Sequence, residues 1–95
     1  MIKINISKDE ITIKGHSGYA SDGFDIVCAS VSSISITTVN ALLSIDEDCI
    51  EYIDKDGYLN IKIKKHNETI DKLIDNMIDL FKSLEKDYKK YIEIR

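Results

Sequence analysis

A histidine and a cysteine, His16 and Cys28, flank a glycine-containing stretch of the chain and together could carry out nucleophilic chemistry. A cysteine attacks a carbonyl carbon as a thiolate, and a nearby imidazole and the positive end of a helix dipole both stabilise a thiolate. Twelve positions separate the two residues, which is enough for the chain to fold back and bring them together. His16 would then accept the thiol proton and later return it to a leaving amine.

The residues around Cys28 indicate how a helix would support this chemistry. Asp25 is the expected N-cap of a helix that begins near Ile26, which places Cys28 in the first turn. Backbone N–H groups around Cys28 and Ala29 would then stabilise an oxyanion. Ser32 lies one turn beyond Cys28 on the same face, so its hydroxyl is a further candidate support. We expect Asp25 to cap the helix rather than to orient the imidazole as a third catalytic group.

The segment from Gly15 to Phe24 has no hydrophobic period of either the strand or the helix type. An unpatterned segment of this length in a small domain is most often functional or mobile. We therefore predict a loop that orders over bound substrate, in which the aromatic side chains contact the substrate or anchor the closed loop. Its candidate contact residues are Gly15, Tyr19, Gly23 and Phe24.

The same residues resemble the signature of the Prp family of ribosomal-processing cysteine proteases. The signature joins a Gly-His pair, here Gly15 and His16, to a Gly-x-Asp-Ile-Val-Cys-Ala run that begins at Gly23, and then to Ser32. The likeness extends over the whole chain, which has the short length and the order of strands and helices of that family. The chain is therefore expected to be a single Prp-like domain over residues 1–95.

The resemblance implies a function and a site. It implies a cysteine endopeptidase whose dyad is His16 and Cys28. In that family the bacterial large-subunit ribosomal protein number twenty-seven is made with a short N-terminal extension, which the protease removes after a pair of aromatic residues. The implied partner is therefore a ribosomal protein precursor. Two positions depart from the family pattern, Ser17 where alanine is common and Lys89 where proline is frequent, and neither belongs to the dyad.

The residues alone leave other functions open. Cysteine is among the most buried residue types, so Cys28 without its flanking signature would indicate packing, and His16 would be an ordinary loop histidine. The main alternative is a non-catalytic ribosome-associated binding module, and a redox-sensing thiol is a third possibility. No zinc site is expected, because neither cysteine has another cysteine or a histidine within four residues. We predict no metal and no other cofactor.

Composition restricts the class of protein. Ninety-five residues with 43% hydrophobic and 32% charged content indicate one ordinary globular domain. A net charge of −4 argues against direct nucleic-acid binding, because affinity for a polyanion depends on lysine and arginine. The alternating N-terminal segment contains no apolar run that could serve as a signal peptide or membrane span. We therefore expect a cytoplasmic protein with no membrane partner and with reduced thiols.

Hydrophobic periods predict an α+β domain in which a mixed or antiparallel sheet of about five short strands carries two main helices. A first hairpin is followed by a helix over about 26–44, and a second hairpin turns at Asp56 and Gly57. A second helix is capped by Asn67 or Thr69, and a short strand ends the chain. Outside the site, Cys49 is predicted to pack in the core and His66 to be solvated. The predicted strands are 2–6, 11–13, 49–54, 58–64 and 91–94.

The first predicted helix carries apolar residues on two sides. One stripe includes Val31 and Leu42, and a second includes Ile36, Val39 and Leu43. We predict that the second stripe would face water in a monomer, and that a second copy of the chain covers it in a homodimer.

Overall fold

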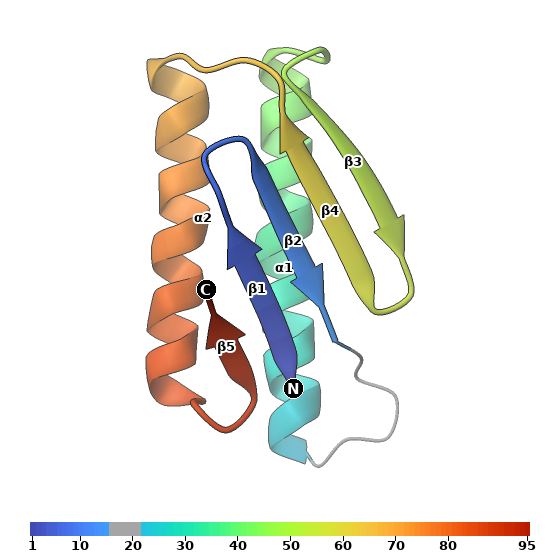
Figure 1. The fold of residues 1–95 in the computed structure, drawn as a ribbon, viewed down its shortest axis with the longest axis vertical. Helices are drawn as coiled ribbons and strands as arrows, with labels where there is room; N and C mark the ends of the chain where they lie inside the picture. The colour runs from blue at the N-terminus through green and yellow to red at the C-terminus, as the bar shows by residue number, and fades with distance from the viewer. Residues whose placement is uncertain (16–21) are drawn as a thin grey trace.

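The computed structural model describes residues 1–15 and 22–95, with residues 22–25 described as backbone only. Seven elements follow one another along this part of the chain, and their order alternates pairs of strands with single helices (Figure 1). They are β1 (Ile2–Ile6), β2 (Glu10–Lys14), α1 (Asp22–Ile45), β3 (Ile50–Lys55), β4 (Tyr58–Ile63), α2 (Glu68–Asp87) and β5 (Ile92–Ile94).

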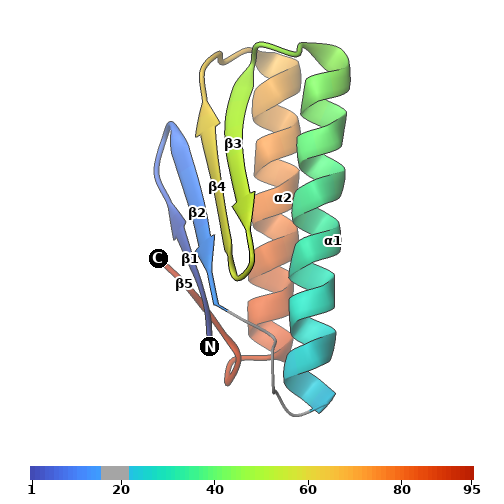
Figure 2. The same ribbon diagram turned by 90° about the vertical axis from the view of Figure 1, so that its right-hand side faces the viewer.

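The strands form one sheet in the order β3-β4-β2-β1-β5. β5 runs parallel to β1, and every other neighbouring pair is antiparallel, so the sheet is mixed. Figure 2 shows both helices packed on the same face of the sheet, which gives a domain of two layers. This arrangement confirms the predicted fold class.

Alternating isoleucines place the core between the sheet and the helices. Ile4 is paired with Ile13, and Ile11 with Ile61, and all four side chains are buried on the helix side of the sheet. Burying each such side chain contributes about 1.5–3 kcal/mol to folding. The helices supply the other half of the core, which includes Val27, Val31, Val39, Leu42, Ile70, Ile74, Met77 and Phe81.

α1 begins four residues earlier than predicted, at Asp22 instead of near Ile26. The prediction that Asp25 is the N-cap is therefore wrong, because Asp25 lies inside the helix. Positions 22 and 25 both fall in the first turn, where the helix dipole favours negative charge. This preference offsets the roughly 1 kcal/mol by which Gly23 disfavours a helical backbone.

α1 is the core helix of the domain. Residues 26–45 are long and apolar enough to cross a membrane, with a mean hydropathy of 1.8. A third of this segment is buried in the fold, where Val27 and Leu42 are fully buried in the core. The buried Ser35 and Thr38 hydroxyls donate to backbone carbonyls one turn earlier, at 2.6 and 2.8 Å, so neither brings an unsatisfied hydroxyl into the core.

The second apolar stripe of α1 is only partly exposed. Val39 is 1% exposed within the single chain, so the prediction that this residue faces water is wrong. Ile36 and Leu43 are half-buried. The chain's own sheet and α2 therefore cover part of the stripe predicted to contact a second subunit, and the homodimer stays a prediction.

α2 is capped by Asn67, the first of the two predicted candidates. The Asn67 side chain accepts a hydrogen bond of 2.9 Å from the backbone N–H of Ile70. Such a cap stabilises a helix by about 1 kcal/mol. The helix then buries one residue per turn against the sheet, as its helical period predicted.

Gly15 holds the end of β2 against two other segments. Its backbone N–H donates to the carbonyl of Gly57 in the β3–β4 turn at 3.0 Å, and its φ is +134°. A β-carbon here would lie 2.7 Å from the Met1 carbonyl oxygen and 2.8 Å from the Ile2 Cα. No side chain fits there without moving the start of β1.

We expect Gly15→Ala to lower the free energy of unfolding by at least about 1–3 kcal/mol, the cost of the strained backbone alone. Chemical denaturation measures this loss. Gly57→Asn is the matched control, because the φ of +72° at Gly57 is one that asparagine tolerates. Equal stability of Gly15→Ala and the wild-type protein would contradict this reading of Gly15.

His66 is exposed, as predicted, and its ring also bridges two carboxylates. Its Nε2 lies 2.7 Å from Asp9 Oδ1 and its Nδ1 lies 2.8 Å from Asp71 Oδ1. The hydrogen bonds to Asp71 and then to Asp9 raise the pKa of His66 above its ordinary value of 6.5. The charged imidazole therefore links the β1–β2 turn to the first turn of α2.

The stabilisation from His66 depends on pH. Because the pKa of His66 is raised in the folded state, the contribution is fully present below the unfolded pKa and is lost as pH rises through the folded pKa. We expect the wild-type protein to lose more stability than His66→Gln between about pH 5.5 and about pH 8.5. Urea unfolding of both proteins at both pH values measures the difference, and parallel pH profiles would contradict the bridge.

Candidate active site

Cys28 is the seventh residue of α1, and its side chain is half-buried. One turn later Ser32 lines the same cavity as Cys28, and Ser35 lies further along its wall. The predicted common face of Cys28 and Ser32 is therefore confirmed. The thiol and these serines form the helix side of the cavity.

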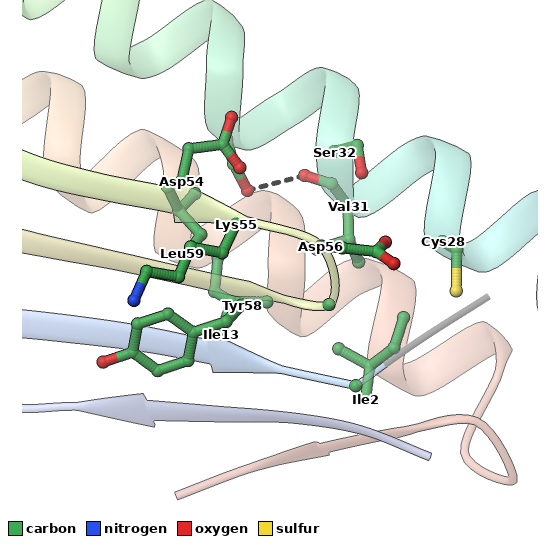
Figure 3. Close-up of a pocket in the computed structure, with 13 residues that line it drawn as sticks. Ile2, Ile13, Cys28, Val31, Ser32, Asp54, Lys55, Asp56, Tyr58 and Leu59 are labelled. Atoms are coloured by element: carbon green, nitrogen blue, oxygen red, sulfur yellow. Dashed lines mark hydrogen bonds between the residues drawn. The ribbon is translucent and has the colours of Figure 1, made fainter. Parts of the chain in front are cut away.

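The cavity has a volume of about 430 Å³ and opens between α1, the ends of β1 and β2, and the β3–β4 turn. Figure 3 shows the Cys28 sulfur directed from α1 into the space above the ends of these strands. A space of this size accommodates a small ligand or a few side chains of a peptide. Its apolar walls come from Ile2, Ile13, Val31 and Leu59.

The β3–β4 turn gives the cavity an acidic side that sequence reasoning missed. Asp54 and Asp56 line the cavity together with Lys55. In Figure 3 Asp54 points toward α1, and the Asp56 carboxylate extends from the turn toward the side on which Cys28 lies. The Asp-Gly pair predicted a turn at the correct place, but only the packing of the hairpin against α1 brings it near Cys28.

The predicted histidine base lies outside the described residues, as does Tyr19. Gly15, which is bonded directly to His16, lines the cavity that contains Cys28. The structure therefore places the residue that precedes the predicted base at the site. The pairing of His16 with Cys28 stays a prediction.

Several predicted support residues lie elsewhere than expected. Gly23 and Phe24 belong to the first turn of α1 and not to a loop, because the helix begins at Asp22. Ala29 is exposed and lies in a groove between α1 and α2, away from the Cys28 cavity. In a regular helix from Asp22, the N–H groups of residues 28 and 29 bond to carbonyls four residues earlier. Ala29 could donate to an oxyanion only if the first turn opened.

The two cysteines occupy different environments. Cys49 is fully buried, as predicted, and its Sγ lies 3.5 Å from the Leu42 carbonyl oxygen. Burial, followed by the negative charge of Asp46, raises the pKa of the Cys49 thiol. Since a nucleophile must be both ionised and accessible, Cys49 is unsuited to attack and Cys28 is the candidate.

The family model and the relatives found by comparison with known proteins agree on one family. The model of the family described as cysteine protease Prp matches residues 1–93. The ribosomal processing cysteine protease Prp of Staphylococcus aureus is 25% identical over 88 residues, covering 90% of this chain and 83% of the relative. The protein of the same name from Mycoplasma genitalium is 56% identical over 34 residues, or 36% of this chain and 34% of the relative.

Solved structures share the fold. The crystal structure of S. aureus Prp in complex with a substrate peptide has a TM-score of 0.85 at 20% identity, covering 99% of this chain and 95% of that one. A Streptococcus mutans protein has a TM-score of 0.78 at 26% identity, covering 99% of this chain and 90% of that one. At 20% identity, the likeness to the S. aureus structure shows that the two proteins share the two-layer fold.

Proposed function

Since the chain belongs to the Prp family of cysteine proteases, it is a cysteine-type peptidase, and we propose that it removes the N-terminal extension of the large-subunit ribosomal protein number twenty-seven. The substrate assignment is supported by relatives named ribosomal processing cysteine proteases and by a similarly folded protein that binds a substrate peptide. In this proposal residues 1–95 form one protease domain in the cytoplasm, and its partner is the ribosomal protein precursor.

One observation carries the chemical part of the proposal. Cys28 lies half-buried on the wall of a cavity that Gly15, the neighbour of His16, also lines. A thiol in this position is reachable by an extended peptide and yet shielded on one side from water. The other thiol, Cys49, is fully buried and cannot be reached by a peptide.

The proposed mechanism has two steps. The Cys28 thiolate attacks the scissile carbonyl carbon while His16 holds the thiol proton, and His16 then gives that proton to the leaving amine. A thioester joins Cys28 to the N-terminal fragment, and the ribosomal protein departs with a new N-terminus. Water then attacks the thioester, His16 takes a proton from it, and the thiol is restored. The chemistry needs no cofactor.

Ser32 is the proposed support for the negative charge that develops on the carbonyl oxygen. Its hydroxyl lies one helical turn from Cys28 on the same cavity wall and can donate a hydrogen bond into the cavity. Asp25 and Ala29 are weaker candidates for this support. α1 begins before Asp25, and Ala29 lies in a groove away from the cavity. Gly15, Tyr19, Gly23 and Phe24 remain candidate substrate contacts.

The proposal includes a homodimer that leaves the Cys28 cavity open. Ile36 and Leu43 on α1 keep part of their apolar surface exposed and are the residues available for such a contact. The negative net charge of −4 suits a basic ribosomal protein as partner better than a nucleic acid.

Mass spectrometry of a synthetic peptide that spans the extension and the start of the mature ribosomal protein tests this function. We expect the wild-type protein to make a single cut after the aromatic pair. A peptide that binds and is never cut would instead support the ribosome-associated binding module. Oxidation of Cys28 without any cut would support a redox-sensing thiol.

A further inference from the structure

β3 is an edge strand, and no strand of the described residues pairs with its outer side. All its residues after Ile50 are exposed, including two large apolar ones, Tyr52 at 46% and Ile53 at 47%. Soluble proteins normally protect such an edge with charges, bulges or a covering segment, because it is a template for another strand. β3 carries the charged residues Glu51, Asp54 and Lys55, which discourage general association, while its unpaired backbone groups stay open to a specific extended peptide.

The register of the hairpin determines which backbone groups point outward. Lys55 is paired with Tyr58 across the two-residue turn, and in a hairpin of this length such a pair exchanges both backbone hydrogen bonds. At the other end, the N–H of Lys64 donates to the carbonyl of Cys49 at 2.8 Å, which fits the same alternation. The odd-numbered residues of β3 therefore bond to β4.

The even-numbered residues turn their backbone groups to the open edge. These are Ile50, Tyr52 and Asp54, and no hydrogen bond joins their outward N–H or C=O groups to any described residue. An added strand would form its backbone hydrogen bonds with every second residue of β3, which is the spacing of these residues. The backbone N–H and C=O groups of Tyr52 and Asp54 can therefore bond to an added strand.

The same edge ends at the cavity of Cys28. Asp54 and Lys55 line that cavity opposite Ser32, and Figure 3 shows the end of β3 facing α1 across it. A strand added along β3 would consequently enter the cavity and approach the thiol. The unpaired edge and the candidate nucleophile form one continuous surface.

We infer that β3 binds the substrate as an added strand, which presents the scissile bond to Cys28. The substrate backbone bonds to Tyr52 and Asp54, and the exposed Tyr52 and Ile53 side chains, which lie on opposite faces of β3, pack against apolar side chains of the peptide. This inference rests on the proposed peptidase function. A second copy of the chain, pairing through the same edge, is the competing occupant.

Backbone N-methylation of the precursor peptide tests the strand addition without altering the protein. Each N-methyl group removes one donor, so peptides methylated at every second residue on the N-terminal side of the cut should lose about tenfold in kcat/KM. Peptides methylated at the intervening residues should stay within about threefold. The Kd of the same peptides for Cys28→Ala should follow the same alternation.

The possible outcomes separate the inference from the function. Cleavage of the unmethylated peptide without alternation would overturn the strand addition and leave the peptidase in place. An alternating Kd without any cleavage would support the strand addition and overturn the peptidase. Absence of both cleavage and binding would overturn both.

Two protein variants distinguish the substrate from a second copy. Tyr52→Ala should raise KM several-fold with little change in kcat, whereas Leu80→Ala should not, because Leu80 is comparably exposed at 44% but lies on α2. Sedimentation of wild-type protein and Tyr52→Ala reports the oligomeric state. A dimer that Tyr52→Ala dissociates, with KM unchanged, would assign the edge to a second copy and contradict the inference.

Discussion

We expect Cys28→Ala to cut the precursor peptide more than about a thousandfold more slowly than the wild-type protein. Alanine has no sulfur to attack the carbonyl, and no other cysteine of the chain can replace it, since Cys49 is buried and its thiol pKa is raised. The half-buried position of Cys28 means that the truncation should leave the fold nearly unchanged. Product formation followed by mass spectrometry over hours measures the residual rate.

The matched control for this variant is Cys49→Ala. It removes the other thiol from the core and should retain the wild-type cleavage rate within about threefold, with a modest loss of stability of about 1 kcal/mol. Circular dichroism and thermal unfolding of both variants separate lost chemistry from lost folding. Substantial activity in a folded Cys28→Ala protein would remove Cys28 from the mechanism.

The second large effect is expected for His16→Ala, which should slow cleavage by about 10²–10⁴-fold. That range is the usual contribution of one positioned acid–base group, and the imidazole is proposed to act in both steps. The loss should appear mainly in kcat, because the imidazole moves a proton and does not hold the peptide.

The other histidine of the chain gives the control for His16→Ala. His66 bonds to Asp9 and Asp71 outside the Cys28 cavity, so His66→Gln should keep the cleavage rate at a pH where the protein is folded. The pH profile of kcat/KM should change in His16→Ala alone, because the thiolate then forms without the imidazole that holds its proton. Unchanged cleavage and an unchanged pH profile in that variant would assign the base to another group.

Local patterns were sufficient to predict most of the fold. The alternating isoleucines of β1 and β2 and the Asp-Gly turn of the β3–β4 hairpin each agree with the structure because every one depends on neighbouring residues. The start of α1 could not be predicted because its local pattern is not helical. Its first turn contains a glycine and two aspartates, and no apolar period marks it as helix.

The site was predictable only in part. The signature selected Cys28 and Ser32, which share the cavity wall in the structure. No sequence pattern marks Asp54 or the outward-facing backbone groups of β3 as part of the site. They lie beside Cys28 only because their hairpin, more than twenty residues further along the chain, packs against α1. The two carboxylates that bind His66 were missed likewise, since one of them is contributed by the distant β1–β2 turn.

The most direct test of the account is to identify the residue that attacks the scissile carbonyl. A peptide that ends at the aromatic pair with a chloromethyl ketone in place of the leaving amine would alkylate the attacking atom, with loss of chloride. Digestion and mass spectrometry then locate the adduct. The account predicts one adduct, on the Sγ of Cys28, that intact substrate peptide prevents. An adduct confined to another residue, in a protein that still cuts the intact peptide, would contradict it.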